Sequence, residues 1–133
     1  EGLKDGTIEV LASDHAPHSA EKKALGMVEA PFGVIGLETM LPVSYTQLVQ
    51  NHGLDLNRVI AMLTVNPAKI VGLDAGTLSE GAAADIAILD LDTEWTIDKD
   101  TFKSKSRNCP FHGMKVKGKA TDVFVDGKHF VND

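Results

Sequence analysis

The order of hydrophobic and polar positions predicts a short strand, a long loop, several helices and a β-rich tail. Residues 7–12 form an apolar, partly β-branched run that starts after Gly6 and ends at a polar cluster, which is typical of a buried strand in a parallel sheet. Residues 1–6 read like the end of a helix that enters a turn. Residues 13–36 show no regular period and carry three glycines and two prolines, so we expect a long loop of the kind that is usually functional or disordered.

Three helices are expected between this loop and the tail. The first has apolar side chains on one face of residues 37–49 and a capping glycine, Gly53. Pro42 removes one backbone donor within this stretch, so the helix should kink or start near it. Asp55 fits the N-cap of the second helix. Asn66, which is followed by a proline, gives the same start signal for a short third helix.

After the helices the period becomes that of strands. Residues 86–91 read as one strand. Residues 121–125 and 128–131 flank Asp126 and Gly127, and this dipeptide between two β-prone runs is the strongest short-range signal for a hairpin. The chain is therefore predicted to be α/β, with one strand before the long loop, the other strands in the tail and no internal repeat.

Composition narrows the class of protein. The chain has 133 residues, 43% of them hydrophobic and 24% charged, which is normal for one globular domain with a real core. The net charge of −6 and the lack of a basic stripe argue against a nucleic-acid partner. No apolar run approaches the roughly 20 residues that span a bilayer. The single cysteine, Cys109, cannot form an intramolecular disulfide, so we expect a cytoplasmic protein in which this thiol is half-buried and structural.

The candidate chemistry lies where the predicted strand meets the loop. Asp14 directly follows the strand, and α/β enzymes place catalytic groups at the carboxyl ends of their strands. A carboxylate there can bind a divalent cation and accept a proton from water. The alternative is that Asp14 caps a turn and that His15 and His18 are ordinary surface residues. The two histidines and the rigid Pro17 favour the functional interpretation.

Several motifs resemble those of the class I dihydroorotases, which belong to the amidohydrolases. Residues 12–18, followed by Lys23, are similar to the strand-eight signature of that family, and residues 29–39 to its loop and helix start. Other resembling stretches, some shared more widely among amidohydrolases, are residues 66–73, 76–81, 84–86 and 105–113, the last with Cys109 where Thr is more usual. The resemblance therefore spans essentially the whole chain.

The resemblance implies a fold and two parts. The chain would be the C-terminal fragment of a TIM-type (β/α)8 amidohydrolase barrel plus part of a small β-sandwich domain. Residues 1–72 would hold the last barrel strand, the active-site loop and the following helices, and residues 73–133 the β-rich part of the sandwich. A whole barrel takes roughly 250 residues, so we expect the missing part upstream and an isolated chain that is inactive.

The resemblance also implies a metal site. Asp14 would be a zinc ligand and the acid/base that handles the proton of the hydrolytic water, in a site with one or two zinc ions. Zinc needs about three or four protein ligands, and the five histidines of this chain include no His-x-His pair, so the other ligands would lie outside it. His15 is expected to support the loop.

Substrate contacts are implied for three residues. His18 would help to hold the carboxylate of the substrate, and Phe32 and Gly33 would offer backbone groups to the dihydropyrimidine ring. Lys22 and Lys23 are expected to form a solvated edge of the loop, although closure of the loop over an anionic substrate could use them.

The implied reaction is the reversible cyclisation of N-carbamoyl-L-aspartate to dihydroorotate, in pyrimidine biosynthesis. The partners would be this small substrate, the remainder of the barrel, further copies of the same protein and, in some systems, aspartate transcarbamoylase. Two alternatives remain: a related cyclic amidase of the hydantoinase or allantoinase type, and a non-catalytic scaffold subunit for aspartate transcarbamoylase. The second histidine of the motif and the Pro31-Phe32-Gly33 run disfavour the first, and an intact Asp14 and His18 disfavour the second.

Overall fold

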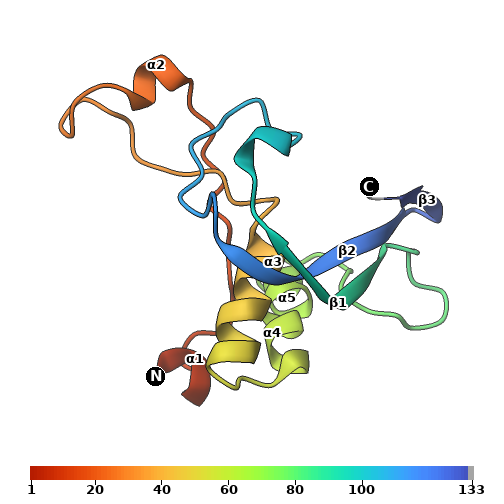
Figure 1. The fold of residues 1–133 in the computed structure, drawn as a ribbon. Helices are drawn as coiled ribbons and strands as arrows, with labels where there is room; N and C mark the ends of the chain where they lie inside the picture. Colours follow the sequence, from red (N-terminus) through yellow and green to blue (C-terminus); the bar gives the residue numbers. More distant parts are fainter. Residues whose placement is uncertain (132–133) are drawn as a thin grey trace.

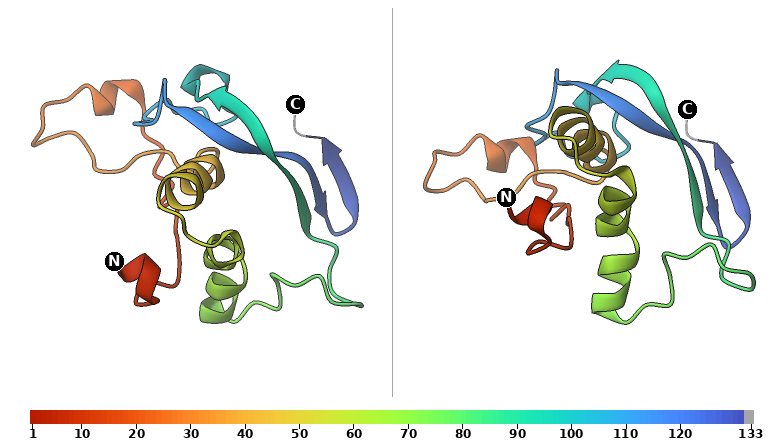
Figure 2. Two further views of the ribbon diagram at one scale, coloured as in Figure 1. Left: turned by 60° about the horizontal axis from the view of Figure 1, so that its bottom comes forward. Right: turned by 90° about the horizontal axis from the view of Figure 1, so that it is seen from below.

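The computed structural model describes residues 1–131 and has three parts (Figure 1). A long loop projects to one side, a group of helices lies in the middle, and an antiparallel sheet crosses over the helices (Figure 2). In chain order the elements are α1 Gly2–Asp5, α2 Ala20–Lys23, α3 Met40–Ser44, the π-helix η1 Tyr45–Asn51, α4 Leu56–Leu63, α5 Val65–Val71, β1 Ile86–Thr96, the 3-10 helix η2 Lys99–Thr101, β2 Lys115–Val125 and β3 Lys128–Val131. None of the helices in residues 1–131 is long and apolar enough to cross a bilayer.

The predicted strand at residues 7–12 does not form. The chain there is extended, but it lies against helices: the Leu11 N–H donates to the Met62 carbonyl at 3.1 Å, and the Asn66 side chain donates to the Glu9 carbonyl at 2.8 Å. A parallel strand exists only beside another strand, and the sheet described here holds only β1, β2 and β3. The residues before this segment do form a short helix, α1, which ends at Gly6 in a left-handed conformation, as predicted.

The predicted helix starts were confirmed where they depend on residues close together in the sequence. Asp55 caps α4, with its side chain accepting the Arg58 N–H at 3.0 Å. Pro42 lies in the first turn of α3, where its missing donor costs nothing, so the helix starts near it. Asn66 lies inside α5, because the N-cap is Thr64. The prediction of Asn66 as the cap was therefore wrong by two positions.

The π-helix η1 was not predicted from the sequence. Its repeat brings residues five apart together, and the Gln50 side chain donates to the Tyr45 hydroxyl at 2.8 Å. Tyr45 is buried against β2, and the next residue, Thr46, bonds to the backbone of that strand. The wider turn of η1 thus lies where the helical group meets the sheet.

The predicted hairpin was confirmed. β2 and β3 are antiparallel, and both turn residues, Asp126 at φ +48° and Gly127 at φ +74°, have the positive φ values of a two-residue turn. Phe124 and His129 are cross-strand partners whose rings stack at 4.7 Å. A hydrogen bond from His129 holds the pKa of the Asp122 carboxyl below its ordinary value. At a pH above the ordinary pKa of the carboxyl, this contact therefore stabilises the hairpin in full. The stabilisation is lost as the pH falls through the lowered pKa of Asp122.

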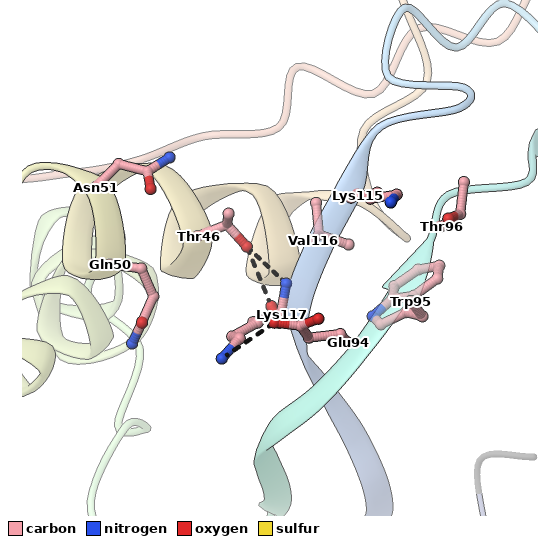
Figure 3. A pocket seen from close by; sticks show the side chains of 9 residues that line it. All are labelled: Thr46, Gln50, Asn51, Glu94, Trp95, Thr96, Lys115, Val116 and Lys117. Carbon is pink, nitrogen blue, oxygen red and sulfur yellow. Dashed lines mark hydrogen bonds and ion pairs between the residues drawn. The ribbon is translucent and has the colours of Figure 1, made fainter.

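The helices pack tightly on the sheet where Tyr45 and Thr46 of η1 meet residues 117 and 118 of β2, a contact that we call the seam. The Thr46 hydroxyl accepts the Lys117 N–H at 2.8 Å and lies 3.3 Å from the Lys117 carbonyl, so it occupies backbone positions that would otherwise be an open strand edge (Figure 3). Gly118 has φ +89°, and a Cβ built on it would lie 3.0 Å from the Tyr45 ring. The seam opens into a cleft lined by Gln50 and Trp95, among others.

One cluster of the hydrophobic core lies between the end of the long loop and the sheet. Its buried members are Ile35, Ile97, Phe102 and Val116, with Cys109 among the partly buried side chains packed against them. The prediction of Cys109 as a half-buried structural thiol is therefore consistent with its surroundings. Because Ile35 ends the loop, the core fixes one end of the segment that carries the candidate chemistry.

The seam predicts unequal costs for two glycine substitutions. Gly53→Ala imposes only the left-handed backbone, since nothing lies within 4 Å of the added carbon, and should lower the free energy of unfolding by about 1 kcal/mol. Gly118→Ala imposes the same backbone and a clash with Tyr45, and should cost roughly 1 to 3 kcal/mol more. Urea denaturation of both variants measures the difference. Equal losses would show that the Tyr45 ring moves aside at no cost, and would contradict tight packing between η1 and β2.

Candidate active site

Asp14 lies in the loop with its carboxylate unpaired. The residue is exposed and has φ +41°, a left-handed conformation that few residues other than glycine adopt. Within residues 1–131 neither a hydrogen bond nor an ion pair uses its side chain. An unpaired carboxylate on constrained backbone is free to take a cation or a proton from a group outside this segment.

His15 supports the loop, as expected. Its Nδ1 accepts the N–H of Gly36 at 3.1 Å and of Leu37 at 3.3 Å. Next to it, the Ala16 N–H donates to the Val34 carbonyl at 2.9 Å, in the short parallel bridge between residues 15 and 34. With Nδ1 accepting, the neutral ring carries its proton on Nε2. His15 therefore joins the two ends of the loop.

His18 contacts the other predicted substrate residues. Its Nε2 lies 2.8 Å from the Phe32 carbonyl, and because a carbonyl only accepts, Nε2 is the donor. A Cβ built on Gly33 would lie 3.6 Å from the same nitrogen. His18, Phe32 and Gly33 thus form one group, whereas within residues 1–131 neither a hydrogen bond nor an ion pair joins the Asp14 side chain to this group.

Glycine is required at position 33. The residue has φ +107°, and an added Cβ would lie 2.4 Å from the Ala16 Cβ, closer than two carbon atoms can approach. The neighbouring Phe32 ring is 95% exposed, so the backbone at this point is held by the packing of Gly33 on Ala16 and by hydrogen bonds, not by burial of the ring.

Lys23 is not at a solvated edge. Its side chain is half-buried, and its ammonium donates to the Pro31 carbonyl at 3.0 Å and the Gly33 carbonyl at 3.2 Å. The prediction of a solvated Lys23 was therefore wrong, while Lys22 is exposed as predicted. The spacing of Lys23 after the His18 motif, which matches that of the family, already singled this residue out. Its hydrogen-bond partners lie eight and ten residues further along the chain, so the local sequence could not identify them.

The tail folds back on the loop through Asn108. Its side-chain N–H groups donate to the Ala16 carbonyl at 2.9 Å and the Gly33 carbonyl at 3.2 Å. Its backbone carbonyl accepts the Ile35 N–H at 3.1 Å. These partners are 73 to 92 positions away in the chain, so no local pattern could identify the residue.

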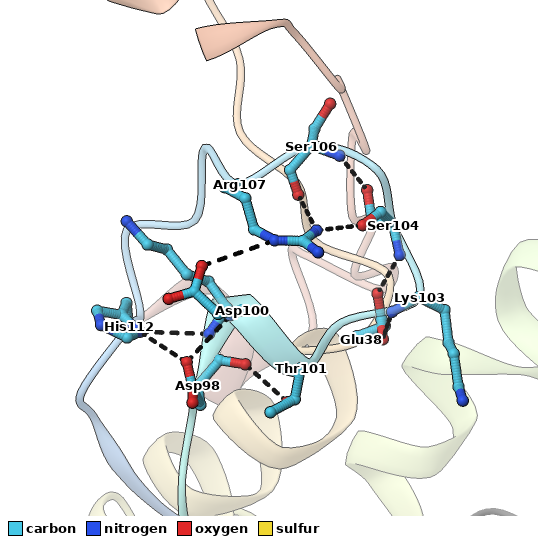
Figure 4. Close-up of polar contacts among 10 residues, drawn as sticks. Glu38, Asp98, Asp100, Thr101, Lys103, Ser104, Ser106, Arg107 and His112 are labelled. Atoms are coloured by element: carbon cyan, nitrogen blue, oxygen red, sulfur yellow. Dashed lines mark hydrogen bonds and ion pairs between the residues drawn. The ribbon is translucent and has the colours of Figure 1, made fainter.

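A polar network holds the rest of the tail in place (Figure 4). The Glu38 carboxylate accepts the backbone N–H groups of Lys103 at 2.9 Å and Ser104 at 3.1 Å. The Arg107 guanidinium donates to the carbonyls of Ser104 and Ser106. Asn108 is therefore presented to the loop by a segment that is itself fixed to the start of the helical region.

The described residues fit a metal ion only in part. Asp14 has the charge, exposure and free oxygens of a ligand. Among residues 1–131, however, no group of three His, Cys, Asp or Glu side chains is close enough to hold an ion, and catalytic zinc takes about three protein ligands. Asp14 fits as one ligand of a site whose others come from beyond the described residues.

Comparisons place the chain among known proteins. The model of the amidohydrolase family matches residues 1–129. A dihydroorotase of Brevibacillus brevis is 53% identical over 127 residues, which are 96% of this chain and 30% of that protein, and one of Geobacillus thermodenitrificans is 49% identical over 127 residues, with the same coverage. The chain thus spans about 30% of the length of these relatives.

Two solved structures show the same fold. The L-hydantoinase of Arthrobacter aurescens has a TM-score of 0.92 and 36% identity, and the dihydropyrimidinase of Brevibacillus agri has a TM-score of 0.91 and 28% identity. The matches cover 99% and 98% of this chain, respectively, and 30% of each structure. The described fold is therefore that of one part of these larger enzymes.

Gly33→Ala should open the loop. The added carbon cannot lie beside Ala16, so the bridge from Ala16 to Val34 should break and the Ala16 amide proton should exchange at least tenfold faster with solvent. Gly26→Ala is the matched control, because it lies in the same loop with nothing within 4 Å. Exchange measured by NMR in both variants checks this; unchanged protection in Gly33→Ala would contradict the described packing.

Proposed function

The chain belongs to the amidohydrolase family, and we propose that it forms one wall of the active site of a zinc-dependent dihydroorotase, which interconverts N-carbamoyl-L-aspartate and dihydroorotate. The carrying observation is the loop itself, in which an unpaired Asp14 lies four residues before a His18 that is fixed to the Phe32 backbone. The similar proteins named dihydroorotase support this reaction. The rest of the barrel would complete the site, and we call the form that includes it the barrel-complete enzyme.

Asp14 is proposed as zinc ligand and general acid/base. Bound zinc would supply a Lewis acid at the scissile carbonyl. In the hydrolytic direction the oxygen of water bonds to the ring carbonyl carbon, and Asp14 takes the proton that is released. The C–N bond then breaks, and Asp14 returns this proton to the departing nitrogen. One carboxylate can serve both steps because it gains and loses a single proton.

His18 is proposed to hold the carboxylate of the substrate. Its Nε2–H is already used by the Phe32 carbonyl, so Nδ1 is the atom left for a ligand. Nδ1 donates to a carboxylate only when both ring nitrogens carry protons, and the ring is then also positively charged. The contact to Phe32 thus selects which side of the ring faces the anion.

The Phe32 and Gly33 backbone is proposed to contact the ring. The carbonyls of both residues already accept hydrogen bonds, from His18 and from Lys23 and Asn108. Their N–H groups have no acceptor within residues 1–131. The segment therefore offers donors, which suit a carbonyl oxygen of the dihydropyrimidine ring.

A hydantoinase-type cyclic amidase is the second candidate. The structural neighbours favour it, but their identities of 26–36% are lower than the 49–53% of the dihydroorotases. The scaffold alternative would leave Asp14 and His18 without a use. Four further features stay predictions that follow from the resemblance to dihydroorotases: zinc, a cytoplasmic location, formation of a homo-oligomer and pairing with aspartate transcarbamoylase.

The two motif residues should differ in their effects on the barrel-complete enzyme. Asp14→Asn removes the proton acceptor and a charged ligand, so kcat should fall at least about a hundred- to ten-thousand-fold and zinc content should drop. His18→Ala removes an anion contact, so KM should rise while zinc content stays. Steady-state kinetics and metal analysis measure both. Loss of zinc from the His18 variant would refute the assigned roles.

The 133-residue chain alone should be inactive. Within residues 1–131 no three-ligand group exists, so isothermal titration with zinc should show weak binding at most, and dihydroorotate should not be consumed. Asp14→Ala serves as the control for any weak binding. Tight stoichiometric zinc together with turnover would overturn the proposal that the site needs the remaining barrel.

A further inference from the structure

The Gly33 carbonyl is held from two directions. The Lys23 ammonium and the Asn108 carboxamide each lie 3.2 Å from this one oxygen, and both donate to it. Lys23 comes from α2, within the loop itself, and Asn108 comes from the tail between η2 and β2. A carbonyl oxygen has two lone pairs, so both of its acceptor positions are filled.

Lys23 holds the base of the loop tip, which apolar burial does not order. The tip of the loop carries Met27 and Val28, which are 94% and 97% exposed, so apolar burial does not order it. The ammonium reaches across the base of this tip to the Pro31 and Gly33 carbonyls. Hydrogen bonds from a charged donor are stronger than neutral ones, and these two are also shielded by the half-burial of the side chain.

Asn108 ties both arms of the loop to the tail. Its two N–H groups are split between Ala16 on the first arm and Gly33 on the second. Its carboxamide oxygen is buried without a partner in the described residues, so the side chain is held there by its donors alone. An aspartate at this position would turn a carboxylate oxygen toward two carbonyl oxygens.

We propose that Lys23 and Asn108 are positioning residues that act together through the Gly33 carbonyl, fixing the backbone that His18 and Phe32 share. In a trans peptide the N–H points away from the carbonyl of the preceding residue. The bond from Lys23 to the Pro31 carbonyl therefore sets the direction of the Phe32 N–H, and the bond from His18 to the Phe32 carbonyl sets that of the Gly33 N–H. Fixing the Gly33 carbonyl keeps this stretch of backbone, with its two N–H groups, directed toward the substrate. The effect on substrate binding rests on the proposed function, whereas the effect on the loop does not.

The loop is tested first, in the 133-residue chain, by amide exchange at Ala16 and Ile35. Lys23→Met keeps the length of the side chain and removes both hydrogen bonds, so these amides should exchange about tenfold faster. Lys22→Met loses the same charge from an exposed neighbour and should change nothing. Lys23→Arg keeps a donor and charge and should restore most of the protection. Equal exchange in the Lys23→Met and Lys22→Met variants would overturn the proposal.

Asn108 is tested by a double-mutant cycle on the same amides. Asn108→Asp should match or exceed the effect of Lys23→Met, because it replaces the donor by a repelling oxygen. If both residues act through one carbonyl, the double variant should lose less protection than the product of the single losses. If the loss of protection in the double variant equals the product of the two single losses, the residues act independently and the proposal of joint action is contradicted. If Asn108→Asp fails to fold, Asn108→Ser keeps a smaller donor and takes its place in the cycle.

Kinetics of the barrel-complete enzyme then separate the two proposals. Lys23→Met should raise the KM for dihydroorotate about tenfold, with a smaller fall in kcat and unchanged zinc content, and Lys22→Met should match the parent. Faster exchange without a change in KM would support the positioning role and refute the substrate role proposed for Phe32 and Gly33. Unchanged exchange would refute positioning whatever the kinetics show.

Discussion

The hydrogen bond from the Ala16 N–H to the Val34 carbonyl closes the long loop, and the rest of the site depends on that closure. Bringing together two points 18 residues apart costs chain entropy, which one hydrogen bond cannot offset. His15, Lys23 and Asn108 each add bonds across the same gap, and Ile35 enters the hydrophobic core at its end. Only when the arms are closed does Gly33 lie against Ala16, and only then does His18 reach the Phe32 carbonyl.

The tail contributes to the site although no proposed catalytic group lies in it. Glu38 fixes residues 103 and 104, and this places Asn108 against both arms of the loop. The boundary predicted between residues 72 and 73 stays a prediction, yet these contacts run across it. The β-rich tail can therefore support the loop that carries the candidate site, in addition to forming a sheet of its own.

The sequence predicted the features whose cause is local. Asp55 caps its helix through a residue three positions on, and the Asp126-Gly127 turn needs only the φ values that these two residues tolerate. The prediction of a strand at residues 7–12 was wrong because a strand needs a neighbouring strand, and in the described residues this segment lies against helices. Lys23 and Asn108 were missed for the same reason, since their roles come from carbonyl groups brought near by the fold.

Asp14 and His18 are held in different ways, and this difference bears on how the site assembles. His18 is oriented by a protein carbonyl, so the side of the site that is proposed to recognise the substrate is arranged before any ligand arrives. Asp14 has an unpaired carboxylate and backbone in the left-handed region, so the orientation of its side chain is left to whatever binds it. The double role proposed for Asp14, as proton acceptor and as metal ligand, would gain from this arrangement, because a strong hydrogen bond within the loop would compete with both tasks. The loop is thus held by hydrogen bonds where the substrate is proposed to bind, and the Asp14 side chain is left free where the chemistry is proposed to occur.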